Sequence, residues 1–559
     1  MKKALLAATL LFAVPLSPAQ TVVDPNLTVD VVIRNLALPI AMEFLRNDSV
    51  SEFFVTERFS GRVKLVRNGA VAGIVLDLAV NTETERGLLG MTKHPDFETN
   101  GFIYLFYSPS THDGGPWMGN RVSRFRWNGT ALVDELIILD VLPDPNQANG
   151  PIHHGGILLF GPDRKLYGVT GDLNRGKFSN PRIEQNSDPN NPSGVGGIFR
   201  YNDDGSIPGD NPFVDHSSPH IQRLFAYGIR NSFGLAFDPL TGRLWQTENS
   251  PVNYDEINLI DKGFNSGWIK IMGPDARNAA YSENGQRNWD AHELVHLPGS
   301  YYGDPKFSWT NPVPAVTSIA FARSARYDPG VIDEAIVGDW NNSALYLFPM
   351  NAQRNGFNLT GPLADLVADG AAERDLSLWG TGWRTSTDMD IGADGYIYCV
   401  NYINGLVVRI RPVNSPTVIN GEASLADFGA HPLNVPLRLD IYQNDALVET
   451  IDTQLDAFGK FSVRAQTTGA IKVVAKPSHW LSVARDSLAL SSGGHIYLKL
   501  NFAYNGDVNG DNTIDDTDLS LILTAFGVQD DDIDQNGDGL VDDVDLSIVL
   551  TNFGQAGQE

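Results

Sequence analysis

The chain has 559 residues, a formal net charge of −26 at pH 7 and a single cysteine, Cys399. This length exceeds what one hydrophobic core supports, so we expect two or more domains. The negative charge argues against nucleic acid as a partner, and a single cysteine excludes an intrachain disulfide. Cys399 lies in the apolar stretch 396–400, where the pattern predicts a strand in the core.

The first nineteen residues have the pattern of a secretory signal. Lys2 and Lys3 are followed by an apolar run to about Leu16 and then by small residues up to Ala19. This run is too short to span a membrane, and no later run is long enough. We therefore predict a signal peptide at 1–19 and an exported protein, periplasmic or secreted, without a membrane span.

A recurring pattern fills residues 20–412. An apolar strand is followed by a turn rich in Pro, Asp and Gly, and then by an apolar strand with a Tyr or Trp. Clear copies have turns at 94–96, 161–163, 238–242 and 392–395, and weaker copies lie at 53–66 and 336–347. Six such units in about 390 residues predict a mainly β protein with a six-bladed β-propeller. The stretches 185–197 and 272–305 are rich in Gly, Pro and Asn, and we expect them to be loops on the face that carries the site.

Two adjacent histidines precede one of these units. His153 and His154 are followed by Gly155, Gly156 and the apolar run 157–160. Glycine lets a backbone approach a ligand closely, and histidine is the side chain best suited to move a proton near neutral pH. The segment therefore predicts a general base at the mouth of a β structure.

Several longer motifs occur in one order along the first 412 residues. They are Glu85-Arg86-Gly87-Leu88-Leu89-Gly90, His153 to Asp163, Gly205 to Phe213, Ala226 to Asn231, Asp255 to Ile260 and Asn265 to Trp268. On these motifs the chain resembles the glucose/sorbosone dehydrogenases, which use pyrroloquinoline quinone (PQQ) on a six-bladed propeller. The resemblance implies a PQQ- and calcium-dependent enzyme that oxidises an aldose at C1 to the lactone and passes the electrons to an unspecified acceptor.

The resemblance also assigns roles to residues. His153 matches the base that takes the proton of the anomeric hydroxyl, and its distance from the turn at 161–163 fits the family better than that of His154. Arg230 matches the cation that stabilises negative charge near the quinone oxygen. The residues assigned to the cofactor are Glu85, Asn231 and Arg323, and the backbone carbonyls of Ser250 and Pro251 are assigned to the catalytic Ca²⁺.

The chain departs from the family at the cofactor clamp. Thr385 and Thr387 stand where the glucose enzymes have an Arg-x-Arg pair, and Ile152 replaces an aspartate beside the base. Arg384, one residue out of register, is the remaining candidate for this cofactor contact, since arginine pairs with carboxylates in a bidentate way. The alternative is a non-catalytic propeller that binds carbohydrate or protein.

Residues 413–504 predict a small antiparallel β-sandwich that acts as a spacer. Apolar and polar residues alternate in short runs at 437–442, 447–451, 459–463, 471–475 and 496–500. The region is similar to the carboxypeptidase-regulatory or CnaB-like sandwiches of exported bacterial enzymes. We expect His479 and Trp480 to form a packed aromatic corner rather than a sugar contact.

Residues 505–559 contain thirteen Asp, one Glu and no Lys or Arg. The segments 507–518 and 534–545 each place oxygen-bearing side chains at positions 1, 3, 5, 9 and 12 and a backbone carbonyl at position 7, which is the donor set that Ca²⁺ needs. The predicted ligands are Asp507, Asn509, Asp511, Thr513, Asp515 and Asp518 in the first loop, and Asp534, Asn536, Asp538, Leu540, Asp542 and Asp545 in the second.

Each predicted calcium loop leads into an amphipathic helix. The apolar positions of the two helices match at offsets 0, 3, 4 and 7, namely Leu519, Ile522, Leu523 and Phe526 with Leu546, Val549, Leu550 and Phe553. The tail resembles a dockerin type I module, which implies a cohesin-like or cell-surface partner. Asn512 departs from the pattern, because a glycine is usual at this turn.

Overall fold

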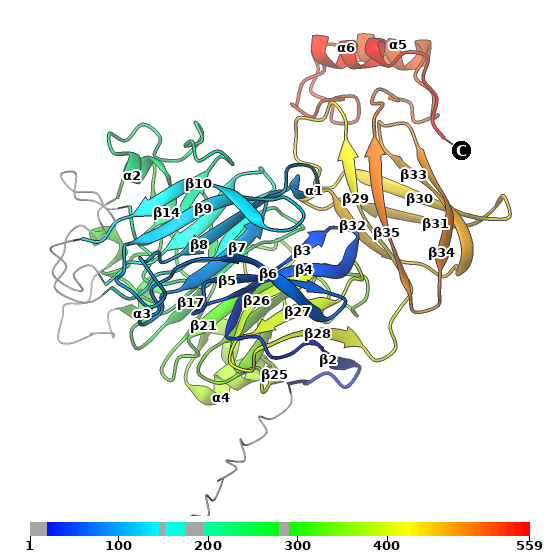
Figure 1. Ribbon diagram of the computed structural model, residues 1–559. Coiled ribbons are helices and arrows are strands. Elements are labelled where there is room, and N and C mark those ends of the chain that lie inside the picture. Colours follow the sequence, from blue (N-terminus) through cyan, green and yellow to red (C-terminus); the bar gives the residue numbers. More distant parts are fainter. Residues whose placement is uncertain (1–19, 145–150, 175–193, 279–289, 295, 559) are drawn as a thin grey trace, which may run out of the picture.

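The computed structural model describes residues 20–144, 151–174, 194–278, 290–294 and 296–558. Three parts follow one another along the chain: a ring of sheets, a two-sheet sandwich and a pair of helices (Figure 1). The predicted signal peptide and most of the predicted loop 185–197 lie outside the described residues. No helix in the described ranges is both long enough and apolar enough to cross a membrane.

Within the described residues, the part up to Pro412 forms six sheets. Sheet 1 contains β3 (Pro39–Arg46), β4 (Ser49–Glu57), β5 (Arg62–Arg67) and β6 (Ala70–Asp77). Sheet 2 contains β7 (Leu88–Lys93), β8 (Phe102–Tyr107), β9 (Asn120–Trp127) and β10 (Leu132–Val141). Sheet 3 contains β11 (Leu158–Phe160), β12 (Leu166–Thr170), β13 (Gly197–Tyr201) and β14 (Leu224–Tyr227), extended by β18 (Phe264–Asn265) and β19 (Tyr301–Tyr302).

The other three sheets have the same plan. Sheet 4 contains β15 (Gly234–Phe237), β16 (Leu244–Glu248), β17 (Asp255–Ile260), β20 (Phe307–Trp309) and β24 (Val367–Ala368). Sheet 5 contains β21 (Val316–Phe321), β22 (Ala335–Asp339), β23 (Ala344–Phe348), β25 (Leu378–Thr381) and β1 (Thr21–Val22). Sheet 6 contains β26 (Ser386–Ile391), β27 (Ile397–Asn401), β28 (Leu406–Pro412) and β2 (Leu27–Ile33). Short helices α1 (Phe97–Asn100), α2 (Pro219–Gln222), α3 (Asp275–Asn278) and α4 (Ala371–Arg374) lie in the connections.

The first strands of the six sheets contact one another in cyclic order, from β3 through β7, β11, β15, β21 and β26 back to β3. The start of the chain closes this ring, because β2 pairs antiparallel with β28 and places Asp30 opposite Arg409. The four clear copies of the sequence pattern lie between the first and second strands of their sheets. The two weaker copies lie one strand later, between β4 and β5 and between β22 and β23.

The first strands run in the same direction, so the ring has two distinct ends. Gly90 of β7 and Gly234 of β15 leave no room for a side chain. A Cβ on Gly90 would lie 2.0 Å from the carbonyl oxygen of Gly156, just before β11. A Cβ on Gly234 would lie 2.3 Å from the carbonyl oxygen of Thr317 in β21. The backbones of these neighbouring first strands therefore approach closely at the two glycines. We call the end where these strands begin the loop end, and the end where they finish the sandwich end.

The sheets are held together by apolar clusters between neighbours. One cluster joins sheets 4 and 5 and contains the fully buried side chains of Trp245, Trp309 and Phe348. Cys399 in β27 is fully buried in the next cluster, which confirms the prediction of a core cysteine. Burying apolar side chains of this size stabilises the ring by about 1.5–3 kcal/mol for each side chain.

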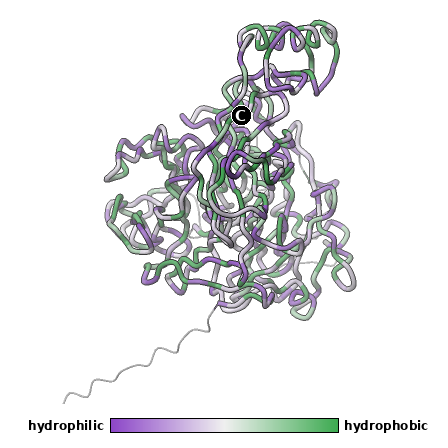
Figure 2. The backbone as a smooth tube through the Cα atoms, turned by 90° about the vertical axis from the view of Figure 1, so that its right-hand side faces the viewer, coloured by the Kyte–Doolittle hydropathy of each residue, from purple (hydrophilic) through white to green (hydrophobic). Residues whose placement is uncertain are grey.

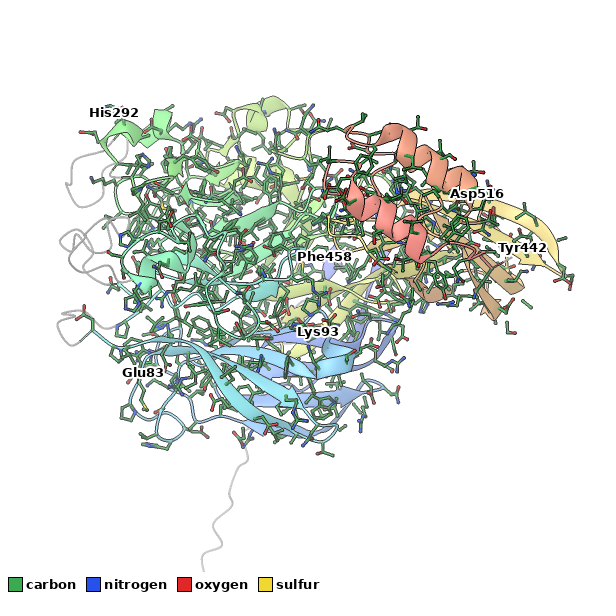
Figure 3. The ribbon with its side chains drawn as sticks, turned by 90° about the horizontal axis from the view of Figure 1, so that it is seen from above. Glu83, Lys93, His292, Tyr442, Phe458 and Asp516 are labelled. Carbon is green, nitrogen blue, oxygen red and sulfur yellow. The ribbon has the colours of Figure 1, made fainter. Side chains whose placement is uncertain are left out.

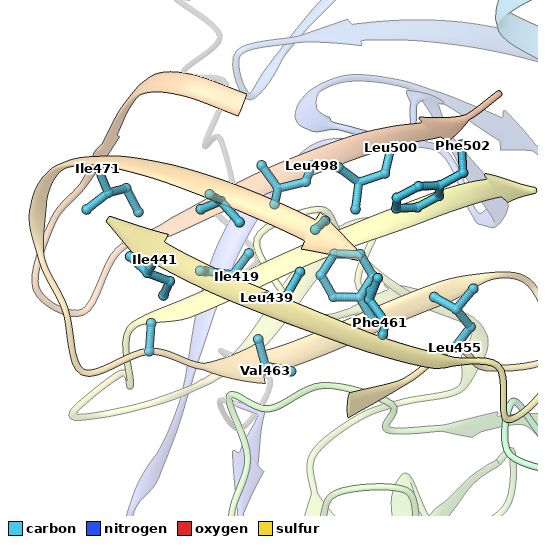
Figure 4. Packing of buried hydrophobic residues seen from close by; sticks show 14 of the residues in the cluster. Ile419, Leu439, Ile441, Leu455, Phe461, Val463, Ile471, Leu498, Leu500 and Phe502 are labelled. Atoms are coloured by element: carbon cyan, nitrogen blue, oxygen red, sulfur yellow. The ribbon is translucent and has the colours of Figure 1, made fainter. Parts of the chain in front are cut away.

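The sandwich consists of two sheets around one hydrophobic core (Figure 4). One sheet contains β29 (Val418–Leu425), β32 (Lys460–Arg464) and β35 (His495–Phe502), and the other contains β30 (Pro436–Gln443), β31 (Ala446–Gln454), β33 (Gly469–Pro477) and β34 (Val483–Leu490). The prediction of a purely antiparallel sandwich is wrong, because β29 and β35 pair in parallel with Val418 opposite His495. The first and last strands lie side by side, which an alternating pattern cannot reveal. Trp480 is 1% exposed and stacks on His479, which confirms the aromatic corner.

The sandwich is bound tightly to the sandwich end of the ring. Arg464 of β32 donates to the carbonyls of Ala325 and Tyr327 at 2.8 and 2.9 Å. Arg326, which is 1% exposed, reaches from the ring to the carbonyl of Gly493 at 2.9 Å. Phe458, labelled in Figure 3, contacts the ring of Phe237 with a centroid distance of 6.3 Å. These contacts cover the sandwich end of the ring, which is the end opposite His153.

The tail forms α5 (Asp516–Ala525) and α6 (Asp543–Thr551), which lie against each other above the sandwich (Figure 1). Each helix starts with a capping box, in which the side chains of Asp515 and Asp542 accept backbone hydrogen bonds. Ile522 and Val549 are buried between the helices, whereas Leu523 and Leu550 are 56% and 53% exposed. Hydrophobic and hydrophilic segments alternate along this part of the chain (Figure 2). Half of the matched apolar positions of the two helices are therefore exposed, namely Leu523, Phe526, Leu550 and Phe553.

A carboxylate cluster near the ring axis makes stability depend on pH. Burial raises the pKa of Asp388 in β26 and of Glu43 in β3 to about 7. Because the unfolded chain releases these protons near pH 4, the contribution of these groups to stability falls as pH rises from about 4 to about 7.

We expect Asp388→Asn to raise the melting temperature at pH 8 by about 2–4 °C and to flatten its decline between pH 5 and pH 8. The new amide oxygen can still accept the 2.8 Å hydrogen bond from the Met42 N–H. Thermal unfolding across pH measures this effect. The exposed Asp113→Asn is the matched control, and an equal shift in both variants would contradict the prediction.

Candidate functional site

His153 lies at the loop end, just before β11, in a left-handed conformation with φ 62°. Its Nδ1 is 2.7 Å from Oδ1 of Asp172, which follows β12, and both side chains are buried. Trp268 Nε1 donates to the other oxygen of Asp172 at 2.8 Å, and the Asn174 N–H donates to Oδ1 at 2.7 Å. A carboxylate held in this way favours the tautomer with hydrogen on Nδ1, so Nε2 is the atom that can accept a proton.

His154 has a different environment. It is 0% exposed, and burial lowers its pKa to about 3. Its Nδ1 lies 3.0 Å from the Asn120 amide, and its Nε2 lies 3.2 Å from the carbonyl of Pro151. The imidazole of His154 is therefore neutral, and both of its nitrogens have partners, as expected of a structural histidine.

Glu85 holds the backbone of the histidine pair. Its Oε2 accepts the N–H groups of His153 and His154 at 2.8 and 3.2 Å. The Asn231 amide donates to the same carboxylate at 3.3 Å, and its oxygen accepts the Gly155 N–H at 3.4 Å. The segments before β7, β11 and β15 are thereby joined. Glu85 and Asn231, both predicted to contact a cofactor, use these atoms to position the loop that carries His153.

Arg58, which follows β4, positions the segment that carries Glu85. Its Nε donates to the carbonyl of Arg86 at 3.1 Å and its Nη2 donates to the carbonyl of Thr84. Its Nη1 donates at 2.8 Å to the hydroxyl of Tyr402, which lies in the turn between β27 and β28 of sheet 6. Arg58 is only 9% exposed, so these three contacts replace water around its charge.

Arg230 lies beside the histidine site. Its carbonyl accepts the Asp172 N–H at 2.8 Å, and its guanidinium carbon is 5.5 Å from the ring centre of Trp268. Its Nη1 donates to the carbonyl of Asn249 at 2.8 Å, whereas its Nε is buried without a hydrogen-bond partner. An unpartnered guanidinium N–H next to a buried histidine is suited to an anionic ligand group.

Two carboxyl groups lie behind Arg230. Ser266 Oγ donates to Glu248 at 2.8 Å and is 3.4 Å from Glu256. Burial raises the pKa of Glu248 to about 7 and raises the pKa of Glu256 well above its usual range. Glu248 also accepts the Arg230 N–H at 2.7 Å, so this pair fixes the backbone on which Arg230 stands.

Ser250 and Pro251 follow β16 at the same end of the ring, next to the Asn249 carbonyl that Arg230 contacts. The N–H and hydroxyl of Ser250 both donate to Asp255 Oδ1, at 2.8 and 3.0 Å. Burial raises the pKa of Asp255 to about 6. The predicted calcium-binding turn is therefore held rigidly within reach of the same cluster.

The structure separates the two predicted arginine contacts. Arg384 is exposed and precedes β26, so it lies at the loop end with His153. The hydroxyl of Thr387, at a clamp position, is buried without a hydrogen-bond partner. Arg323 follows β21 at the sandwich end and pairs with Asp333 at 3.0 Å. Burial raises the pKa of Asp456 in the sandwich, and the charge of Arg323 opposes this rise. The structure therefore does not bring Arg323 together with His153.

The two predicted calcium loops of the tail share one hydrogen-bond pattern. The Asn512 N–H donates to Asp507 Oδ2 at 3.0 Å, and the Gly539 N–H donates to Asp534 Oδ2 at 2.6 Å. The N–H groups of position 3 donate to Asp518 and Asp545 at 3.0 and 3.2 Å. In the described part of the chain no three His, Cys, Asp or Glu side chains gather closely enough to hold a metal ion.

Residues 36–408 match the model of the Glucose / Sorbosone dehydrogenase family. The chain belongs to this family. It is 35% identical over 261 residues to an uncharacterized protein of Synechocystis, slr1608, with 44% of this chain and 60% of that protein covered. It is 33% identical over 281 residues to quinoprotein glucose dehydrogenase B of Acinetobacter calcoaceticus, with 46% and 56% covered. The chain thus spans little more than half the length of these relatives.

Other comparisons agree with this family. The aldose sugar dehydrogenase YliI of Escherichia coli is 26% identical over 333 residues, which cover 59% of this chain and 78% of that protein. The crystal structure of the soluble aldose sugar dehydrogenase of Escherichia coli has a TM-score of 0.52 and 24% identity, covering 69% of this chain and 99% of that one. A glucose dehydrogenase structure has a TM-score of 0.54 and 22% identity, covering 68% and 98%. The solved structures support the fold.

For this member of the glucose/sorbosone dehydrogenase family, the structure adds Asp172, Trp268 and Arg58 to the site. Asp172 follows Gly171 at the end of the second apolar run after His153. This position is the one feature of the sequence that could have indicated Asp172 as a site residue. Arg58 lies far from His153 in sequence, so only the ring brings it to the loop that carries Glu85.

Arg58→Ala should destabilise the ring by about 2–4 kcal/mol, because two carbonyls and the Tyr402 hydroxyl lose a charged donor. Urea unfolding followed by tryptophan fluorescence measures the change. Arg126→Ala is the matched control, since its pair with Asp134 is exposed and should contribute less than about 1 kcal/mol. Equal losses in the two variants would show that Arg58 has no special role.

Proposed function

We propose that the chain is an exported, PQQ- and calcium-dependent dehydrogenase that oxidises an aldose at C1 to the lactone, with His153 as the general base. The observation that carries this proposal is the buried His153–Asp172 pair with Arg230 beside it, in a chain of the glucose/sorbosone dehydrogenase family. The closed ring of six sheets supports the six-bladed β-propeller that the repeats predict.

His153 is suited to take the proton of the anomeric hydroxyl on Nε2. Its Nδ1–H is held by Asp172, whose negative charge stabilises the imidazolium that forms. Glu85 fixes the backbone of His153 from the other side, which limits the positions that the ring can adopt. Arg230, whose guanidinium lies over the ring of Trp268 beside this pair, would stabilise the negative charge that develops during the oxidation.

The residues at the loop end fit PQQ in part. The unpartnered Arg230 Nε and the exposed Arg384 provide positive charge for its carboxylates, and the unpartnered Thr387 hydroxyl provides a polar contact. When bound, PQQ would supply a two-electron acceptor for the hydride of C1. The backbone carbonyls of Ser250 and Pro251 would hold the catalytic Ca²⁺.

We also propose that the tail binds two Ca²⁺ ions and docks to a cohesin-like or cell-surface partner. Asp507 Oδ1 is fully buried and has no hydrogen-bond partner. A bound cation would satisfy this buried oxygen. The exposed Leu523, Phe526, Leu550 and Phe553 provide an apolar surface for docking.

A non-catalytic propeller that binds carbohydrate or protein is the second candidate. It is favoured by the clamp positions, where Thr385 and Thr387 replace the arginines that would grip a tricarboxylate. The two candidates differ in one measurable property, the binding of PQQ.

The deciding experiment loads the full chain with Ca²⁺ and PQQ and follows aldose-dependent dye reduction. We expect activity in the wild type and a loss of kcat of about 10²–10⁴-fold in His153→Ala and Asp172→Asn, with PQQ still bound. His495→Gln, an exposed histidine on β35 of the sandwich, is the matched control and should keep full activity. Failure of the wild type to bind PQQ would overturn the enzyme in favour of the second candidate.

A further inference from the structure

Both predicted calcium loops of the tail lie against the sandwich. Asn512 Oδ1 accepts the Ser482 N–H at 2.9 Å and its amide donates to the Ser482 hydroxyl at 2.8 Å. In the second loop, the carbonyl of Asn536 accepts the Gly429 N–H at 2.9 Å. Asn512 therefore replaces the usual glycine because its side chain docks the first loop on the sandwich.

A lysine of the sandwich reaches into the first loop. Lys476 in β33 places its Nζ 2.8 Å from Asp507 Oδ2, and the same nitrogen donates to the carbonyls of Pro477 and Ser478 at 3.1 Å. Asp507 is 0% exposed, so this ion pair is shielded from water. Oδ2 also accepts the Asn512 N–H at 3.0 Å, which leaves the unpartnered Oδ1 to face a cation.

The second loop has no such charge. Asp534 occupies the position equivalent to Asp507, and its two oxygens accept the N–H groups of Gly537 and Gly539 at 2.8 and 2.6 Å. Among the residues that the structure describes, Asp534 forms no ion pair with Lys or Arg.

We propose that Lys476 makes the two loops unequal, so that the second loop fills with Ca²⁺ first and the first loop fills only at higher calcium. The inference rests on the calcium binding proposed above. An ion about 2.4 Å from Asp507 Oδ1 would lie roughly 6 Å from the ammonium group. Repulsion between charges of +2 and +1 at that distance weakens binding about tenfold, even in a medium as polar as water.

Because Lys476 belongs to the sandwich, the sandwich sets the affinity of the first loop. The same lysine and Asn512 attach this loop to the sandwich, so calcium in the first loop neutralises the carboxylate that Lys476 holds and weakens that contact. The joint between sandwich and tail is therefore sensitive to calcium at the concentration where the first loop fills.

The test is calorimetric titration of the metal-free full chain with Ca²⁺ alone. Besides binding at the calcium site proposed at Ser250 and Pro251, we expect two steps from the tail that differ about tenfold in affinity. Asp538→Asn should remove the tighter step and Asp511→Asn the weaker one, which assigns each step to its loop. Lys476→Met should tighten the weaker step about tenfold and leave the tighter step unchanged, whereas Lys476→Arg should keep the difference.

Lys472→Met is the matched control, because this lysine is on the same strand and its nitrogen lies over the ring of Tyr442. It should change neither step. Circular dichroism of each calcium-loaded variant verifies that the tail is folded, and Lys476→Gln serves if Lys476→Met is unfolded. Equal affinities in the wild type, or an unchanged or weakened first loop in Lys476→Met, would overturn the role of Lys476. Absence of any calcium binding would instead overturn the proposed calcium function.

Discussion

The pairing of β2 with β28 is the constraint on which the ring depends. A strand from the start of the chain completes the last sheet, so the six first strands can surround one axis. Only then do the segments before β7, β11 and β15 meet at the loop end and bring Glu85, His153 and Arg230 together. The hydrogen bond from Arg58 to Tyr402 spans the same closure, because it joins sheet 1 to sheet 6.

Three carboxylates hold the groups of the site in place. Asp172 holds the imidazole of His153, Glu85 holds its backbone, and Glu248 holds the backbone of Arg230. Asp172 and Glu248 are buried and Glu85 is partly buried, and each accepts hydrogen bonds from N–H groups. These bonds define the position of each carboxylate, because a carboxylate without them is costly where water is excluded. A base that must meet a sugar hydroxyl at one angle requires this rigidity.

The sandwich does more than separate the ring from the tail. It covers the sandwich end of the ring through Arg464 and Arg326, and it contacts both predicted calcium loops through Ser482, Gly429 and Lys476. The outer surfaces of α5 and α6 are left exposed by this arrangement. The tail is thus presented outward on a firm support, with its predicted calcium loops turned toward the sandwich.

The sequence alone determined what depends on neighbours along the chain. The spacing of turns predicted the strand pairs of the ring, the aspartate spacing predicted two matching loops, and the glycines after His153 marked the loop of the site. Tertiary structure decided everything that joins distant segments. It paired His153 with Asp172 and Arg58 with Tyr402, placed Arg323 at the far end of the ring, set β29 parallel to β35 and brought Lys476 to Asp507. Local spacing records which face a residue takes in its own strand or helix, whereas the partner of a buried charge is fixed only when separate strands pack together.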